Sequence, residues 1–415
     1  TSGWMPGDIK GAFLADTDTV SLVGSGELVT NGTFGTNIAG WTASATASLS
    51  LDANRIKVTN TTAATSFAFQ AVPTVIGETY TATFDTTVGT STNVIVQLGN
   101  SGAGGGQYGN VAGAGFGQNT FVAVSTTLYI TLLNGNGING GTCFFDNISV
   151  KLADADRSVN NKGLVVNGTI TRTAVATGAE LVGYSGFSAS NYLEQPYNAG
   201  LDFGTGDFSI LVWARTNING TFFSRGDGVS AGSWFWRHLG NSTAPFYIHN
   251  GTSLQLVLNV ALPQADFVFL TLVRRSGVVS LYANGQLISS VSGTNPALSM
   301  TNLTAKLRIG EQQDASYVSP QEKQALLRIS ATAPSEAQIA KIYNDEKFLF
   351  QENAACTLYG TSDAVTALAH DDTTDLLHVG TSAGRSVFDG LRRVSNTTVA
   401  VGTAISASNN LIVEE

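Results

Sequence analysis

Charged residues are scarce in this chain. Asp, Glu, Lys and Arg make up 12% of its 415 residues, against about 25% in an ordinary globular domain. Hydrophobic residues make up 43%, so this is not a disordered chain, which would combine few apolar residues with much charge. Thr, Ser, Asn and Gly supply the polarity instead, and they suit half-buried strands and the tight turns between them. The composition predicts many short strands joined by turns.

Clusters of basic residues and long apolar runs are also missing. The net charge is −9, and Lys and Arg come together only in local pairs such as Arg274–Arg275 and Arg392–Arg393. A groove for a phosphate backbone needs clustered positive charge, so we expect no nucleic-acid partner. No apolar run is long enough to cross a bilayer, so we expect no membrane insertion.

Cysteine and histidine are too few and too scattered for the sites they commonly build. Cys143 and Cys356 lie far apart and are predicted to be free, buried thiols. The histidines form no His-Glu-x-x-His or comparable zinc spacing, and no Gly-x-Ser-x-Gly elbow lies between a strand and a helix. We therefore expect no enzyme and no cofactor, with calcium left open. The four histidines are His238, His249, His370 and His378.

At 415 residues and 43.2 kDa, the chain is too long for one core, and roughly three domains are expected. Residues 1–27 carry Trp4 and an apolar stretch at 9–14, which is too little for a core. They are predicted to be an N-terminal arm or attachment segment that docks on another surface. A free tail is the alternative.

Residues 28–152 show the alternation of β-strands. Tyr80, Ala82 and Phe84 face one side and the threonines between them face the other. The Gly-rich segment 99–117 is predicted to be a flexible loop. Glu-Leu-Val-Thr-Asn-Gly-Thr-Phe at 27–34, Gly-Trp at 40–41 and Phe-Asp-Asn-Ile at 145–148 resemble the galactose-binding-like jelly rolls of carbohydrate-binding modules. This resemblance implies a jelly roll, and we expect Trp41 in its core.

Residues 153–333 form a second β unit. Asn284-Gly285 separates two alternating runs and predicts a hairpin. Asp-Phe-Ser-Ile-Leu-Val-Trp at 207–213 and Leu-Tyr-Ala-Asn-Gly at 281–285 resemble laminin-G or concanavalin-A-like sandwiches. Some members bind calcium, for which Asp202 and Asp227 are candidates; isolated turn aspartates are the alternative. The Glu-x-Asp-x-x-Glu strand of concanavalin-like glucanases is missing, which argues against hydrolysis by paired carboxylates.

Residues 334–350 are predicted to be a helix. Ser335 and Gln338 fit a capping box, and an apolar stripe follows through about Phe348. We expect this helix to pack on the sandwich.

Residues 351–415 form a C-terminal β unit. Leu-Leu-His-Val-Gly-Thr at 376–381, after an acidic turn, and Gly-Arg-Ser-Val-Phe-Asp-Gly at 384–390 resemble one blade of a sensor-regulator β-propeller. A propeller needs roughly four to eight blades, so one blade leaves edges and an apolar face exposed. We predict a homotrimer that covers them; packing on another protein is the alternative. The predicted interface residues are His370, His378, Arg385 and Phe388.

A row of aromatic residues is the predicted glycan-binding site. Trp234, Trp236 and His238 share one face of a strand, and Tyr247 and His249 share a face of the next. Aromatic faces stack on sugar rings, and nearby polar groups supply hydrogen bonds. The alternative is that these aromatics fill the core of the sandwich. Asn250 and Asp227 complete the predicted site.

The predicted fold class is all-β: two tandem β-sandwich (jelly-roll) domains, one short helix and a C-terminal β-hairpin or blade-like unit. This order resembles tail-fibre and other adhesin-type structural proteins of bacteriophages. The resemblance implies a virion-attached homotrimer that contacts host cell-surface polysaccharide and other virion proteins, with avidity from repeated weak sites. The alternatives are a purely structural virion protein (head fibre, collar or decoration) and a secreted bacterial glycan-binding protein or polysaccharide-degrading enzyme.

Overall fold

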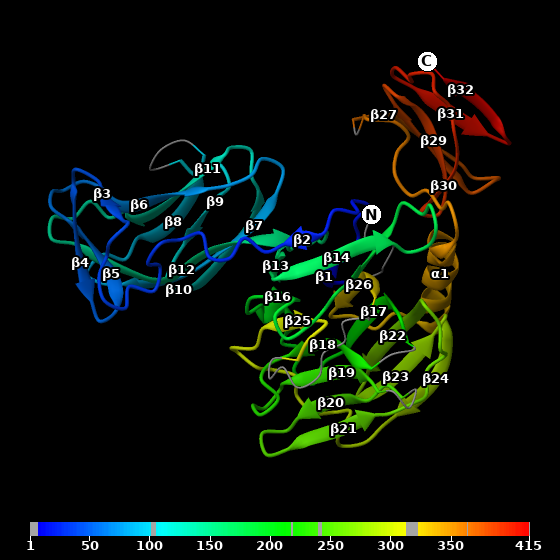
Figure 1. Cartoon of the computed structure of the whole chain (residues 1–415), viewed down its shortest axis with the longest axis horizontal. Helices are drawn as coiled ribbons and strands as arrows, with labels where there is room; N and C mark the ends of the chain where they lie inside the picture. Colours follow the sequence, from blue (N-terminus) through cyan, green and yellow to red (C-terminus); the bar gives the residue numbers. More distant parts are fainter. Residues whose placement is uncertain are drawn as a thin grey trace.

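The structure is a computed structural model that describes residues 7–100, 105–216, 219–239, 243–312, 323–362 and 364–414. Among these residues, α1 (Glu336–Glu346) is the single α-helix, beside two short 3-10 turns, η1 (Ala199–Leu201) and η2 (Lys347–Phe350). Nearly all other elements are antiparallel strands, which confirms the predicted all-β class. Figure 1 shows a jelly roll, a larger sandwich and a small C-terminal unit. No helix in the described ranges has the length and apolar character needed for a membrane crossing.

The jelly roll packs a five-stranded sheet, in the order β3-β6-β11-β8-β9, against part of a 12-stranded sheet. Tyr80, Ala82 and Phe84 are buried between the two, as the alternation predicted. Trp41 is buried 5.7 Å from the ring of Phe34, which confirms its core position. Its strands are β3 (Thr42–Ala43), β4 (Ala47–Asp52), β5 (Arg55–Asn60), β6 (Ser66–Pro73), β7 (Thr79–Val88), β8 (Val94–Gly99), β9 (Gly109–Ala112), β10 (Gly115–Val122), β11 (Thr127–Asn134) and β12 (Thr142–Asp154).

The Gly-rich segment 99–117 is not one flexible loop. Strand β9 lies inside it and β10 begins inside it, whereas residues 101–104 lie outside the described ranges. Gly117 of β10 pairs with Phe84 of β7. A Cβ atom on Gly117 would lie 2.1 Å from the Phe84 ring. Glycine is needed at this position because the Phe84 ring occupies the space that a side chain would fill. The number of glycines in the segment therefore does not by itself indicate flexibility.

The larger sandwich packs a nine-stranded sheet against the rest of the 12-stranded sheet. The predicted hairpin is confirmed: Asn284 and Gly285 have φ of 50° and 78° and join β23 to β24. Its strands are β13 (Leu164–Asn167), β14 (Thr169–Ala174), β15 (Val182–Ser185), β16 (Tyr192–Gln195), β17 (Phe208–Ala214), β18 (Gly220–Arg225), β19 (Trp234–His238), β20 (Phe246–His249), β21 (Leu254–Leu258), β22 (Val268–Arg275), β23 (Val278–Ala283), β24 (Gln286–Val291), β25 (Leu307–Ile309) and β26 (Gln324–Ser330).

The N-terminal segment belongs to this sandwich. β1 (Ile9–Phe13) pairs with β26, and β2 (Leu22–Val23) pairs with β14. Phe13 and Leu14 are buried in the core. Residues 9–23 are therefore part of the sandwich and not a separate attachment arm, and the chain passes from them through the jelly roll and back to the sandwich. Trp4 lies outside the described ranges.

Strand β12 connects the two sandwiches. Its first part pairs with β5 and β7 of the jelly roll, and its last residues, Ala153 and Asp154, pair with Val165 and Leu164 of β13. The 12-stranded sheet thus runs through both domains, and the two lie side by side in Figure 1. Backbone hydrogen bonds of a shared sheet fix one domain against the other.

Helix α1 begins as predicted and packs on the nine-stranded sheet. Ser335 and Gln338 form a capping box. At the other end, Glu346 is fully buried: Trp213 Nε1 donates to its Oε2 at 2.8 Å, and both terminal nitrogens of Arg328 donate to its carboxylate. A buried carboxylate and guanidinium need each other, because either one alone would be an unpaired buried charge.

The C-terminal unit consists of a four-stranded sheet and a hairpin. Its buried apolar cluster is small, comprising Ala367, Val401 and Ile405. Arg393 holds the unit to the sandwich through an ion pair of 3.0 Å with Glu180. Its strands are β27 (Val365–Asp371), β28 (Leu376–Thr381), β29 (Gly384–Asp389), β30 (Arg392–Asn396), β31 (Ile405–Ser408) and β32 (Leu411–Glu414).

Both cysteines are free, as expected. Cys143 is buried, whereas Cys356 is half-buried rather than buried. Burial raises the pKa of each thiol to about 11, so neither side chain is a ready nucleophile.

Asp154 is buried at the junction between the two sandwiches. The Tyr184 hydroxyl donates to its Oδ1 at 3.1 Å. Burial, followed by the neighbouring carboxylate of Asp16, raises the pKa of Asp154 to about 6, although Tyr184, Arg172 and Arg157 act in the opposite direction. The ionised form is thus disfavoured in the folded protein.

We predict that Glu346→Ala lowers the free energy of unfolding by about 3–5 kcal/mol, because it leaves the Arg328 charge buried without its partner. Denaturation with urea, followed by tryptophan fluorescence, measures the change. Lys341→Ala is the control, since it removes an exposed pair with Asp345 and should cost about 0.5 kcal/mol or less. Equal effects of the two substitutions would contradict the assignment.

We predict that Asp154→Asn stabilises the protein above pH 6, by up to about 3 kcal/mol. Because the pKa of Asp154 is higher in the folded than in the unfolded protein, its contribution to the free energy of unfolding is fully present below the ordinary aspartate pKa, near 4. This contribution is lost as the pH rises to 6. Asparagine cannot ionise, so the gain in melting temperature over the parent should shrink from pH 7 down to pH 4. A pH-independent difference in melting temperature would contradict the raised pKa.

Candidate functional site

The predicted aromatic platform lies inside the sandwich. Trp234 and Trp236 are fully buried and His238 is nearly so. The Trp236 ring lies 5.4 Å from the rings of Phe222 and Phe223. The prediction that these three residues face solvent is wrong, because the nine-stranded sheet covers the face of β19 that carries them. The alternative, that they fill the core, is correct.

The other predicted glycan-binding residues do not form a common surface with them. Tyr247 is half-buried, and His249 is buried with its Nδ1 accepting from Gly251 N. Asn250 Oδ1 accepts the amides of its own turn, as Asp227 does in another turn. Although burial opposes it, hydrogen bonds from Ser230 and its neighbours lower the pKa of Asp227 to about 2. These polar groups stabilise turns.

The two calcium candidates already have protein partners. Asp202 accepts from Arg225, Tyr197 and the amide of Asn302 at 2.8 Å each. Asp227 accepts from its own turn. Among the described residues, no group of three or more His, Cys, Asp or Glu side chains could hold a metal ion. Calcium binding therefore stays an untested prediction, without support from either carboxylate.

The predicted oligomer-interface residues are mostly inside the chain. His378 and Phe388 are buried, and Arg385 is paired with Glu414, so the prediction is wrong for His378 and Phe388. His370 is exposed, 2.9 Å and 3.1 Å from the carboxylates of Asp372 and Asp375. It pairs across the ladder with Leu377 and not with His378, so the two histidines leave opposite faces of the sheet.

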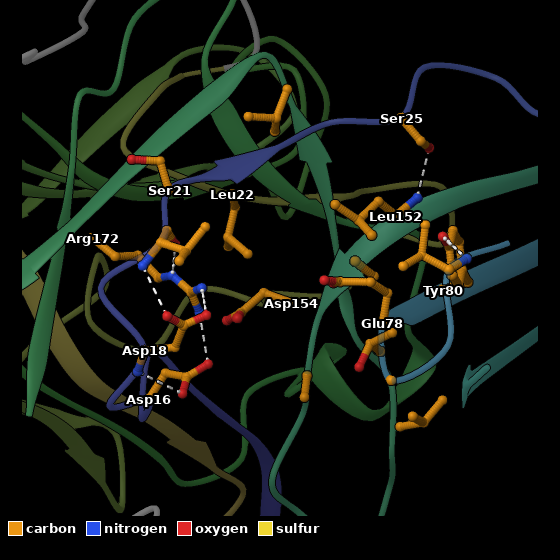
Figure 2. A pocket seen from close by; sticks show the side chains of 18 of the residues that line it. Asp16, Asp18, Ser21, Leu22, Ser25, Glu78, Tyr80, Leu152, Asp154 and Arg172 are labelled. Atoms are coloured by element: carbon orange, nitrogen blue, oxygen red, sulfur yellow. Dashed lines mark hydrogen bonds and ion pairs between the residues drawn. The ribbon is translucent and has the colours of Figure 1, made fainter. Parts of the chain in front are cut away.

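A cleft of about 660 Å³ lies on one side of the junction; we call it the acidic cleft. It is bounded by segment 16–25, the jelly-roll turn at 75–80, the end of β12 and Arg172 of β14. Figure 2 shows Arg172 reaching Asp16 and Asp18 on one side, with Asp154 between them and Glu78. Arg172 donates to each of the two aspartates at 2.7 Å.

A second hollow lies on the opposite face of β7 and β12; we call it the junction groove. Thr81, Thr83, Ser149 and Lys151 alternate with core residues, so their side chains leave the sheet on this other face. The groove measures about 460 Å³, and an adjoining hollow of about 430 Å³ lies beside it. The residues lining the groove are Thr81, Thr83, Phe116, Asn147, Ser149, Lys151, Val165, Glu194, Pro196, Tyr197, Leu303, Thr304 and Lys306.

Two aromatic rings from different domains meet in the junction groove. Phe116 belongs to β10 of the jelly roll and is 47% exposed. Tyr197 belongs to the sandwich, and its ring lies edge-on to Phe116 at 6.5 Å between centroids. The Tyr197 hydroxyl donates to Asp202 at 2.8 Å, which fixes the ring. The two rings offer an apolar wall that is already ordered.

Asn147 lies in a bulge of β12. The pairing of β12 with β7 shifts between Asp146 and Ser149, and Asn147 in the bulge has φ of 51°. Its Nδ2 donates to Asp85 at 2.8 Å. The Glu27 carboxylate accepts from the amide of Val150 and the hydroxyl of Ser149. A bulge redirects a side chain, and here it turns Asn147 outward.

Two of the three motifs that suggested a jelly roll, residues 27–34 and residues 145–148, meet at this bulge. Gly32 O accepts from Ile148 N, and a Cβ on Gly32 would lie 1.9 Å from Ile148 O. Segment 27–34 therefore lies against segment 145–148, and both line the adjoining hollow.

An ion-pair network lies at one side of the groove. Glu194 lies 2.8 Å from both Lys306 Nζ and Arg308 Nε. Lys151 adds a further positive charge. The groove thus combines exposed ring surface with donors of both neutral and charged type.

Sequence reasoning did not find this site. Phe116 lies in the segment that was predicted to be a loop, and Tyr197 belongs to none of the motifs that the sequence offered. Asn147 and Gly32 lie inside the two jelly-roll motifs, and this was the one sequence feature that pointed to the site. Their meeting with residues of the sandwich depends on how β12 joins the domains.

One part of the chain matches a known family. Residues 187–340 match the concanavalin A-like lectin/glucanases superfamily (Laminin_G_3), which is less than half of the chain. No curated protein sequence matches it.

Similar solved structures include receptor-binding regions of botulinum neurotoxins. The binding domain of neurotoxin DC in complex with rat synaptotagmin II is 16% identical over 57% of this chain and 59% of that chain, with a TM-score of 0.38. Neurotoxin type C, studied for cell entry through two ganglioside molecules, is 14% identical over 61% of each chain, with a TM-score of 0.38. The serotype D binding domain is 15% identical over 57% of this chain and 60% of that chain, with a TM-score of 0.39. At these identities the likeness concerns the fold alone, and this chain spans about three-fifths of their length. The family match at residues 187–340, and not these structures, shows that the sandwich is similar to the concanavalin A-like lectin/glucanases superfamily, as its motifs predicted.

Proposed function

We propose that the protein is a non-enzymatic glycan-binding protein without a cofactor and that the junction groove is its sugar site. The observation that carries the proposal is the pairing of exposed Phe116 and fixed Tyr197 beside Asn147 and two lysines in one groove. Sugar rings have apolar faces that pack on aromatic rings and hydroxyls that need hydrogen-bond partners. A volume of about 460 Å³ lies within the usual range of ligand sites.

The biological setting that fits this architecture is a bacteriophage tail fibre or related adhesin on the virion. Host cell-surface polysaccharide would be the ligand, and other virion proteins would hold the chain. Repetition of a weak site on several copies would raise the affinity through avidity. The low charge and the Thr- and Asn-rich strands suit a rigid appendage in solvent.

The C-terminal unit supports a homotrimer. In β32, Leu411 and Val413 are 75% and 62% exposed, while Ile412 between them turns toward the small core. Leu368 of β27 and Val399 are also exposed. An isolated unit with a small core would leave these apolar side chains in contact with water, which is unfavourable. Neighbouring copies of the chain would cover them.

We predict that Phe116→Ala weakens binding to the recognised polysaccharide by about two- to tenfold, as expected for losing one stacked ring. Asn147→Gly removes the amide but keeps the positive φ, and it should weaken binding as well. An array of bacterial surface polysaccharides, followed by calorimetry, measures the affinity. Leu287→Ala, an exposed apolar position on β24, is the control.

The same preparations test the absence of enzyme activity. No reducing ends should appear when the bound polysaccharide is incubated with the protein. Release of reducing ends would contradict the non-enzymatic part of the proposal. A chain that binds no polysaccharide, or a Phe116→Ala variant that binds like the parent, would contradict the site.

We predict that the whole chain has the mass of a trimer in light scattering, and that a double substitution, Leu411→Lys with Val413→Lys, makes it a monomer. The added charges would be buried in the proposed interface and oppose association. Leu287→Lys is the matched control and should stay trimeric. A monomeric parent chain would rule out self-assembly and favour a different protein as the partner of this unit.

A further inference from the structure

The acidic cleft has a rim of exposed aliphatic side chains. Val20, Val23, Val75 and Val122 all line it, and each is between 52% and 68% exposed. They come from the N-terminal segment, the 75–80 turn and the end of β10. Isolated exposed valines are ordinary, but several around one cleft mark an interaction surface.

The floor of the cleft carries excess negative charge. Four carboxyl groups face two guanidinium groups, which leaves two negative charges when all are ionised. Arg172 already donates to two of the carboxylates and to Val20 O. Glu78 is exposed and has no ion pair among the described residues. The four carboxyl groups are Asp16, Asp18, Glu78 and Asp154, and the two guanidinium groups are Arg157 and Arg172.

A terminal strand borders the cleft. β2 is the last strand of the nine-stranded sheet and pairs on one side with β14. Leu22 turns into the core, while Val23 turns outward to the rim. A terminal strand offers main-chain groups to an incoming strand, which is a common way of binding extended peptides.

We propose that the acidic cleft is the docking site for an extended, basic segment of a partner protein, which adds to the edge of β2. Aliphatic side chains of the segment pack on the valine rim. Its Lys or Arg side chains reach the carboxylates of Asp18 and Glu78. A polypeptide fits better than a sugar, because the described residues that line the cleft include no exposed aromatic ring; Tyr80 is buried.

This docking site lies across the sheet from the junction groove and does not rest on glycan binding. The two sites share no lining residue. Either one can fail without the other.

The test uses the full chain and a fluorescent eight-residue peptide of alternating Val and Lys, read by anisotropy. We expect saturable binding that weakens between low and high salt, because exposed charges are screened. Glu78→Gln should weaken binding about two- to fivefold, as for one exposed ion pair. Val20→Lys should abolish binding, because it places a like charge on the rim.

Two matched controls separate the site from general electrostatic attraction. Glu352→Gln removes an exposed carboxylate outside the cleft, and Val88→Lys adds a charge at an exposed valine outside it. Both should bind the peptide like the parent chain. A peptide with acetylated lysines should not bind.

Three results would overturn the proposal. The first is no binding of the Val-Lys peptide at low salt. The second is equal binding by the acetylated peptide or by Val20→Lys. The third is binding of glucosamine oligomers that Val20→Lys abolishes, without binding of the peptide, which would assign the cleft to a cationic sugar.

Discussion

The single constraint on which this structure depends is the pairing of β12 with strands of two domains. Its early residues complete the jelly roll, and Ala153 and Asp154 begin the ladder of the sandwich. A strand has one register with each neighbour, and a slip by one residue would exchange its buried and exposed faces. The bulge at Asp146–Ser149 and the Glu27 contacts pin that register. Both domains are therefore fixed by one segment.

Residues of β7 and β12 contribute to both candidate sites. On one face, Tyr80, Leu152 and Asp154 lie toward the acidic cleft. On the other face, Thr83 and Lys151 lie in the junction groove. The shared sheet thus separates a surface with two aromatic rings and an excess of one positive charge from a surface with aliphatic residues and excess negative charge. One junction therefore presents two chemically distinct surfaces.

Local signals in the sequence predicted local structure well. The Asn284-Gly285 turn, the Ser335–Gln338 capping box and the alternation in β7 depend on neighbouring residues, so they could be identified directly. Trp234 and Trp236 could not be assigned, because a strand gives the same alternation whether its aromatic face meets solvent or a second sheet. Phe116 and Tyr197 could not be paired, because they come from different domains. The site depends on non-local pairing, which periodicity does not encode.

The most direct test of this account is the distance between the two domains in solution. Spin labels on non-canonical amino acids at Ser48 and Ser289 would leave Cys143 and Cys356 untouched. A rigid β12 junction predicts one narrow distance distribution in pulsed dipolar spectroscopy, unchanged by ionic strength. A broad or two-peaked distribution would show that the domains move independently, and both clefts would then lose their fixed geometry.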